Sequence, residues 1–291
     1  MKNILLAITT FIFSLFPSKT GTISGFGKIL ESPSPIVTVL PVATILPTPT
    51  PTASPSPTPK PLTFKELNEL YGPCVYLPTL MYHHIQTEES AKANNQTGLS
   101  VYTNIFNEQM NYLKQNNYNV LSPESLINFF NSNQPIPTKS ILLTFDDAYV
   151  DFYTDAFPIL RNLNFRATVF TPTGLINNSG YLNWNQISEM NASNIYFANH
   201  TWSHKNVLGK LSETQKEITT ADLQLNERGL NSLKVFSYPY GSANEQTQTF
   251  LSSINYQIAY TTRPGSTHCA KQRFNLPRIR IGNRSLKSYG L

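Results

Sequence analysis

The chain has 291 residues, a formal net charge of +5 and two cysteines. Four lysines and one glutamate in residues 1–63 account for three of these charges, so the remainder is nearly neutral. This balance excludes the basic surface of a nucleic-acid-binding protein, and the length permits one large domain or two small ones.

Residues 1–30 are predicted to direct export. A basic start, Met1-Lys2-Asn3, is followed by an apolar run from Ile4 to Phe16, as in a signal peptide. The run is short for a membrane span, and no clear cleavage site follows it. A cleaved signal peptide and an uncleaved N-terminal membrane anchor therefore both stay open, and either one predicts an extracellular or cell-surface protein.

Residues 31–63 are predicted to be a Pro/Thr/Ser-rich linker. Ten of the 21 prolines lie between Pro33 and Pro61, and such segments favour extended conformations without a core. At about 3.1 Å per residue the linker could reach on the order of 100 Å. A disordered tail without a spacer role is an equal alternative.

Residues 64–291 are predicted to form one α/β domain. Short apolar runs alternate with amphipathic segments, the pattern of a mostly parallel sheet. Thr103 and the Ser212–Gln215 capping box are expected to start helices, and Pro158 should kink or shorten a helix over 150–163. The eight expected strands favour a single barrel; they span residues 77–82, 119–121, 141–145, 167–171, 195–198, 234–237, 257–261 and 277–281.

The two cysteines of an exported chain can pair. Cys74 precedes the first expected strand and Cys269 precedes the last, and those strands are neighbours in a closed barrel. A disulfide that joins the two ends is therefore predicted, with two free thiols as the alternative, because the sequence gives no distance.

Asp146 and Asp147 end the apolar strand over 141–145. In α/β folds this end of a strand carries the chemistry. Two adjacent carboxylates at a buried strand end need a nearby cation. The pair therefore indicates a metal site.

His200 and His204 follow the strand over 195–198. Their i, i+4 spacing suits two ligands of one metal on the same side of a helical turn. With one carboxylate they would form a three-ligand site that leaves positions for water and substrate. A structural acid pair with two surface histidines is the alternative.

These two motifs, Thr144-Phe145-Asp146-Asp147 and His200-Thr201-Trp202-Ser203-His204, resemble the first two motifs of the polysaccharide deacetylases, carbohydrate esterase family four, which share the NodB-homology fold. The resemblance covers residues 77–281 and implies a distorted (β/α) barrel. It also implies Asp146 as the catalytic base and Asp147, His200 and His204 as ligands of a divalent metal. Zinc is expected first, with cobalt, nickel or iron as alternatives.

The stretch Phe236–Gly241 resembles the third family motif, arginine-x-proline-aromatic. The resemblance implies that the backbone amide of Tyr240 completes the oxyanion hole. Ser237 stands in the place of the arginine, so another residue must orient Asp146. Arg278 on the last strand is the candidate, also as a substrate-binding residue, and an ordinary ion pair is the alternative.

The stretch Met81-Tyr82-His83-His84-Ile85 resembles the branch that deacetylates poly-β-1,6-N-acetylglucosamine, in which the order of elements is circularly permuted. This resemblance implies His83 as the general acid. His84 should point away from it, because side chains alternate along a strand, and is expected to be structural. Two alternatives stay open: an exchange of the two roles, or a packing role for both histidines. His268 lacks the context of the family's C-terminal leucine-x-histidine motif.

Trp184 lies in a segment that resembles the family's aspartate-x-x-aspartate-tryptophan motif without its acids. It is expected to wall the acetyl pocket or to stack on a sugar ring, and so to bind substrate. A place in the core is the alternative.

The resemblance predicts a hydrolase that removes N-acetyl groups from an extracellular N-acetylglucosamine polymer and releases acetate. Asp146 would take a proton from a metal-activated water, and His83 would protonate the departing nitrogen. Poly-β-1,6-N-acetylglucosamine is the favoured substrate, and peptidoglycan or O-acetylated xylan is the alternative. A non-catalytic glycan-binding module is the alternative of another class.

Overall fold

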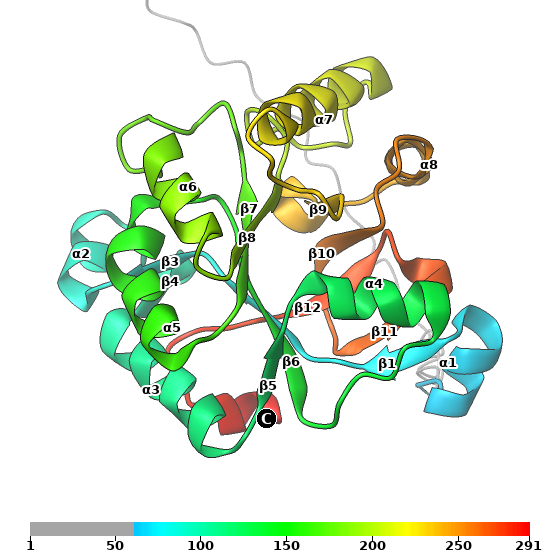
Figure 1. Cartoon of the computed structure of the whole chain (residues 1–291), viewed down its shortest axis with the longest axis horizontal. Coiled ribbons are helices and arrows are strands. Elements are labelled where there is room, and N and C mark those ends of the chain that lie inside the picture. Colours follow the sequence, from blue (N-terminus) through cyan, green and yellow to red (C-terminus); the bar gives the residue numbers. More distant parts are fainter. Residues whose placement is uncertain (1–60) are drawn as a thin grey trace, which may run out of the picture. The chain divides into compact units, whose positions relative to one another are not determined.

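The sheet of the described residues, 61–291, closes into a barrel in the computed structural model (Figure 1). The predicted signal segment and nearly all of the predicted linker lie outside these residues. The ring runs in the order β2 (Thr79–Tyr82), β12 (Leu276–Arg280), β10 (Ile258–Pro264), β9 (Val235–Ser237), β8 (Ile195–Asn199), β7 (Ala167–Thr171) and β6 (Ser140–Phe145). Pairing of β6 with β2 closes it, and all neighbours are parallel.

One of the eight strands of this sheet lies outside the ring. β5 (Asn119–Leu121) pairs with the first half of β6, whereas β7 pairs with the last two residues of β6. The prediction of an α/β barrel is thus confirmed, with β5 as a branch.

The strands β6 and β7 are buried at every position, as expected for parallel strands that are covered on both sides. Neighbouring residues of β6 pack into different clusters, because side chains alternate along a strand. Leu143 packs with residues of α3 (Thr103–Gln115) and α5 (Phe157–Leu163), and Leu142 packs with residues of α4 (Pro123–Ser132). Helices thus pack against both faces of β6 and hold the strand in place.

The remaining long helices, α6 (Trp184–Asn191), α7 (Leu211–Asn226) and α8 (Glu245–Ser253), follow β7, β8 and β9. Figure 1 shows α3 beside α5 and α7 beside α8. Two predicted caps are wrong. Tyr102 is the N-cap of α3, and the Thr103 hydroxyl donates to Asp155 instead. α7 begins before Ser212, because the carbonyl of Lys210 accepts from the amides of residues 213 and 214.

The expected helix over 150–163 is present, but it is not regular. A π-helical turn, η2 (Phe152–Ala156), interrupts it just ahead of Pro158, which lies in the first turn of α5 (Phe157–Leu163). Proline removes one helical hydrogen bond, and the wider turn lies where that bond is lost. The helix is therefore locally distorted near Pro158 and not shortened.

The predicted disulfide between Cys74 and Cys269 is present. It joins β1 (Cys74–Tyr76) to β11 (Thr267–Cys269), which pair antiparallel with the two cysteines opposite each other. Because β2 and β12 follow these strands and pair with each other, the disulfide links the first and last strands of the ring. α1 (Phe64–Tyr71) precedes β1, and η4 (Ala270–Gln272) follows β11.

A second small sheet lies beyond the carboxyl end of β2. β3 (His84–Gln86) pairs in parallel with β4 (Ser100–Tyr102), and α2 (Glu88–Ala93) and η1 (Thr97–Leu99) connect them. The chain ends in η5 (Leu286–Tyr289), and η3 (Pro239–Gly241) follows β9. Within residues 61–291, no helix has the length and apolar character that a membrane span requires.

Candidate active site

Four of the predicted site residues follow the carboxyl ends of parallel strands of the ring. Asp146 and Asp147 follow β6, His83 follows β2, and His200 follows β8. Tyr82 and Phe145 are opposite each other at the ends of β2 and β6, and the amide of Asp146 donates to the carbonyl of Tyr82. Because the strands are parallel, these residues meet at one mouth of the barrel.

Asp147 converges with His200 and His204. Asp147 Oδ1 lies 3.3 Å from Nε2 of His200 and 3.0 Å from Nε2 of His204. Although burial favours its neutral form, the two imidazoles hold the pKa of the Asp147 carboxyl far below its usual value. Among the described residues, the buried Oδ1 atom has no hydrogen-bond partner.

The tautomer of His200 fits a metal ligand. Its Nδ1 lies 2.7 Å from the carbonyl oxygen of Ser237, which can only accept, so Nδ1 carries the proton and Nε2 presents a lone pair. One ligand atom from each of Asp147, His200 and His204 lies within 4.8 Å of the others. A carboxylate oxygen and two imidazole nitrogens directed at one point fit a divalent cation.

The backbone at this cluster occupies an unusual conformation. Asp147, Ala148, Thr201, His204 and Tyr240 have φ between 56° and 76°. The other non-glycine residues with positive φ in residues 61–291 are asparagines, which tolerate this region, and two lysines. A positive φ is costly for a β-branched residue such as Thr201 and marks a functional site when the surroundings enforce it.

Side chains enforce the conformation of the loop that carries the two histidines. Asn199 Oδ1 accepts the amide of Thr201 at 2.8 Å. Glu217 on α7 accepts the amides of Trp202 and Ser203 at 3.1 and 2.8 Å. The predicted helical turn is therefore wrong, because these amides bond to side chains and not to carbonyls of a preceding turn. Both histidines still reach Asp147.

Arg278 takes the place of the absent motif arginine. Its Nη1 and Nη2 donate to Oδ1 and Oδ2 of Asp146, each at 2.7 Å. The remaining donors bond to Thr144 Oγ1, to the Thr261 carbonyl and to Ser237 Oγ. Burial raises the pKa of Asp146, but the Arg278 charge outweighs it and keeps this pKa below the usual value.

The assignment of Arg278 as a substrate-binding residue is wrong. The residue is 0% exposed, and each of its five N–H groups has a partner within the protein. Arg278 therefore positions the Asp146 carboxylate and has no donor for a substrate.

The two consecutive histidines have different surroundings. Burial lowers the pKa of His83, although the charges of Asp146 and Asp147 act in the opposite direction. His84 is 4% exposed, its Nδ1 is hydrogen-bonded to Asp151, and its ring stacks on Tyr149 at 3.6 Å between centroids. His83 is thus the histidine beside the aspartate pair, and His84 is the one with a carboxylate partner.

The sequence did not single out Tyr149 and Tyr181, which lie beside Asp147 of the candidate metal cluster. An isolated antiparallel bridge joins them, and their ring centroids are 5.3 Å apart. Burial and the charge of Asp147 raise the pKa of both phenols. The signals that could have identified them are the place of Tyr149 two residues after Asp147 and of Tyr181 three residues before Trp184.

Trp184 does not join the residues at the barrel mouth. The Arg228 guanidinium lies over its ring at 4.0 Å from the centroid, and the ring packs against the main core cluster. The contacts favour the alternative of a place in the core, because Arg228 already covers one face of the ring. Tyr181, from the same segment, lies near Asp147 instead.

Tyr240 lies against His204, with their ring centroids 4.8 Å apart, and is 65% exposed. The hydrogen bond that closes its turn uses the amide of Gly241, which donates to Tyr238. Gly241 is required here, because a Cβ atom at its φ of 77° would meet the Thr262 side chain within 2 Å. The turn thus holds Tyr240 beside His204, one of the candidate metal ligands.

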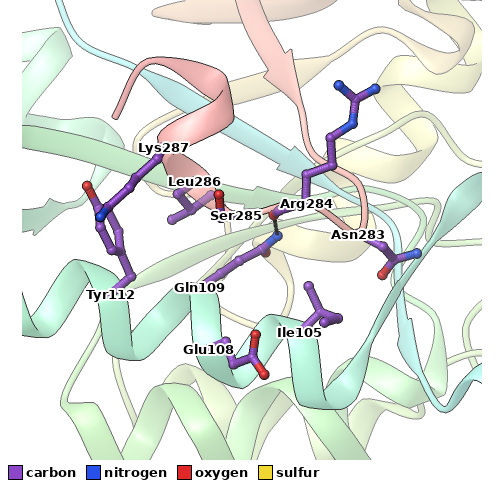
Figure 2. A pocket seen from close by; sticks show the side chains of 9 residues that line it. All are labelled: Ile105, Glu108, Gln109, Tyr112, Asn283, Arg284, Ser285, Leu286 and Lys287. Atoms are coloured by element: carbon purple, nitrogen blue, oxygen red, sulfur yellow. Dashed lines mark hydrogen bonds between the residues drawn. The ribbon is translucent and has the colours of Figure 1, made fainter.

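Two other features lie away from this site. His268 is buried against Thr79 at the amino end of β2, which is the opposite end from His83. A cavity of about 300 Å³ lies between α3 and the C-terminal segment, where Gln109 bonds to the carbonyl of Arg284 (Figure 2). None of the predicted site residues lines this cavity.

Comparison with known proteins identifies the family. A family model described as polysaccharide deacetylase matches residues 133–259. The Bacillus subtilis (strain 168) polysaccharide-deacetylase-type protein YxkH is 30% identical over 206 residues, which cover 70% of this chain and 71% of that protein. The chain belongs to the polysaccharide deacetylase family.

Other members resemble this polysaccharide deacetylase in sequence or structure. The Escherichia coli (strain K12) poly-beta-1,6-N-acetyl-D-glucosamine N-deacetylase is 27% identical over 256 residues. The match covers 72% of this chain and only 37% of that enzyme. The Streptococcus pyogenes deacetylase PplD, solved in complex with acetate, has a TM-score of 0.69 and 29% identity, covering 74% of this chain and 96% of PplD.

Proposed function

We propose that the chain is a metal-dependent N-deacetylase of an extracellular N-acetylglucosamine polymer. One observation carries the proposal: Asp147 joins two imidazoles, while the adjacent Asp146 is held by Arg278 outside that cluster. Hydrolysis of an amide at a metal centre needs both a ligand set and a separate base. The two aspartates supply these two functions from adjacent positions.

Asp147, His200 and His204 are the residues that would hold the metal, and zinc suits this donor set best. Such an ion polarises the acetyl carbonyl and lowers the pKa of water. Its identity is testable by metal analysis. Removal of the ion should abolish activity without changing the fold of the barrel.

Two side chains carry out the proposed proton transfers. Asp146 is ionised at neutral pH because Arg278 holds its pKa low, so it can accept a proton from the attacking water. His83, at the neighbouring strand end, delivers a proton to the departing nitrogen. One water and one acetamido group thus become acetate and a free amine.

The negative charge that develops on the acetyl oxygen in the transition state needs a hydrogen-bond donor. The amide of Tyr240 is the proposed donor, since its turn lies against His204 and a fixed backbone N–H stabilises an oxyanion without reorganisation. Tyr149 and Tyr181 would form the wall of the acetyl pocket beside Asp147.

Poly-β-1,6-N-acetylglucosamine is the favoured substrate. The support is the Met81–Ile85 stretch and the relative from Escherichia coli, whose name states this substrate. Export through residues 1–30, and attachment to a membrane if that segment stays uncleaved, belong to the same proposal. An exported enzyme on a linker meets polymers of the cell surface.

The test is an acetate-release panel with purified protein and added zinc, cobalt or nickel. The substrates are β-1,6- and β-1,4-linked N-acetylglucosamine oligomers, peptidoglycan and O-acetylated xylan. We expect release from the β-1,6 oligomers, loss of release with a chelator, and loss of release with retained metal in Asp146→Asn. A wild-type protein that binds metal and releases no acetate from any of these glycans would be a non-catalytic binding module.

A further inference from the structure

A groove of about 630 Å³ lies beside the metal cluster, a volume within the roughly 300–1,000 Å³ typical of small-molecule sites. Its walls come from the loop after β6, the loop before α6, the start of η2 and the segment from β3 to η1. The lining residues that matter are Tyr149, Tyr181, His84, Asp151, Asp155 and Asn94.

The groove adjoins the candidate active site through two tyrosines. Tyr149 and Tyr181 line the groove, Tyr149 follows Asp147 by two residues, and an antiparallel bridge joins it to Tyr181, with ring centroids 5.3 Å apart. The bridge between Tyr149 and Tyr181 is flanked by hydrogen bonds from Val150 to Gly180 and from Leu182 to Ala148. A polymer with one unit at the metal therefore places its next unit against these rings.

The groove is acidic. Asp151 and Asp155 line it, and no lysine or arginine does. Asp155 accepts from the hydroxyls of Thr103 and Thr154 at 2.9 and 2.6 Å, and Asp151 accepts from His84 and the amide of Ile85. No Lys or Arg side chain in residues 61–291 forms an ion pair with either carboxylate.

His84 provides an independent indication of a ligand. The side chain lines the groove and is 4% exposed. While Nδ1 is bonded to Asp151, the buried Nε2 has no hydrogen-bond partner among the described residues. An unpaired buried nitrogen is costly, and a sugar hydroxyl or amine in the groove would provide its partner.

We propose that this groove is a subsite for the sugar unit next to the one that is deacetylated, and that it prefers a unit whose amine is already free. The inference rests on the proposed function. A glucosamine unit carries an ammonium group, which the carboxylates of Asp151 and Asp155 attract. The sugar face packs on the tyrosine rings, as is common for aromatic side chains in carbohydrate sites. Polymers with anionic substituents are disfavoured by the same charges.

The test compares two β-1,6-linked trimers, one fully N-acetylated and one with a single free amine beside an N-acetylated unit. At low salt we expect the amine-bearing trimer to have a KM about 2–5-fold lower, the range of an exposed ion pair, with little change in kcat. Added salt at 0.5 M should reduce the difference.

Two variants assign the preference to the groove. Asp155→Asn should remove it, whereas Glu69→Gln, which neutralises an exposed carboxylate on α1, should leave it unchanged. Asn94→Lys adds a cation to the groove at an exposed position. The Asn94→Lys variant should raise the KM of the amine-bearing trimer. It tests the inference independently if Asp155→Asn fails to fold.

Equal KM values for the two trimers in the wild type would overturn the inference and leave the proposed function intact. A preference that persists in both Asp155→Asn and Asn94→Lys would also overturn it. If the wild type releases acetate from neither trimer but does so from another glycan, the proposed substrate itself is wrong.

Discussion

Arg278 donates two parallel hydrogen bonds of 2.7 Å to the Asp146 carboxylate. Arg278 lies on β12 and Asp146 follows β6, and β2 separates these two strands in the ring. The same guanidinium donates to the hydroxyl of Ser237, the residue that occupies the place of the motif arginine. A small side chain on β9 therefore leaves room for a cation from β12. The Asp146 carboxylate therefore has an arginine partner from β12 instead of one from the third motif on β9.

Replacing Arg278 should reduce catalysis without loss of the metal. Arg278→Lys retains the charge but loses the paired geometry, and we expect kcat to fall by at least about 100-fold, in the range of lost general-base catalysis. Arg278→Met leaves a buried carboxylate unpaired and should lower the free energy of unfolding by about 3–5 kcal/mol. Acetate release and chemical denaturation measure the two effects.

Metal content separates this function from a general structural one. Both Arg278 variants should bind one metal ion per chain if they fold, because Asp147, His200 and His204 are untouched. Unchanged kcat in Arg278→Lys would show that Asp146 does not depend on this arginine.

Glu217 should set the affinity for the metal although it is not a ligand. Its carboxylate accepts from the amides of Trp202 and Ser203 and from the Ser203 hydroxyl, so it holds the loop between the two histidines. Because residues that orient ligands typically contribute 10–100-fold to metal affinity, we expect Glu217→Ala to weaken binding by about that factor. Competition with a chromophoric chelator measures it.

Glu213→Gln is the matched control. Glu213 lies on the same helix and pairs with Lys205, and both side chains are about half exposed. We expect no more than a small change in metal affinity. Equal affinities of the wild type and Glu217→Ala would contradict the positioning role.

The Cys74–Cys269 disulfide should stabilise the closed barrel. It joins residues 195 positions apart, and a cross-link over a long loop restricts the unfolded chain. The double variant Cys74→Ser/Cys269→Ser should lose about 2–5 kcal/mol of unfolding free energy. Denaturation of the variant and of the reduced wild type should agree, and activity at low temperature should persist because the site lies at the other end of β2.

The sequence predicted the strands that carry the site, because short apolar runs between polar segments are local signals. β5 and β7 match the predicted bounds, the other six strands of the large sheet differ by a few residues, and the short strands β1, β3, β4 and β11 were not predicted. The ligands and base were predicted through two compact motifs. The conformation of the loop after β8 was not predicted, because side-chain hydrogen bonds to Asn199 and Glu217 determine it. Glu217 is distant in the sequence, so no local pattern shows its contact with this loop.

The assignments that were missed at the barrel mouth concern Tyr149, Tyr181 and Trp184. The pairing of Arg278 with Asp146, 132 residues apart, was expected because the last strand returns to the same mouth, but its full burial, which leaves no donor for a substrate, was not. Tyr149 and Tyr181 meet through a single bridge between two loops. Trp184 was favoured over Tyr181 because a motif resemblance marks a residue but does not show which side chain faces the mouth.

His268 should make stability depend on pH. It is fully buried, and burial lowers its pKa from 6.5 to about 4. Nε2 is bonded to the carbonyl of Leu77 and to Thr79 Oγ1, while Nδ1 has no partner among the described residues. The folded state therefore favours the neutral imidazole of His268 over the protonated one.

The folded pKa is below the unfolded one, so the unfolded chain binds the extra proton between pH 6.5 and 4. Stability from this residue is complete above pH 6.5 and is lost as the pH falls toward 4, by about 3 kcal/mol in total. His268→Gln keeps a donor for the Leu77 carbonyl and does not titrate. Denaturation from pH 7.5 to 4.5 with a chelator present, so that metal release does not contribute, should show a steeper loss in the wild type than in the variant. Parallel curves for the two proteins would mean that His268 is protonated without cost in the fold.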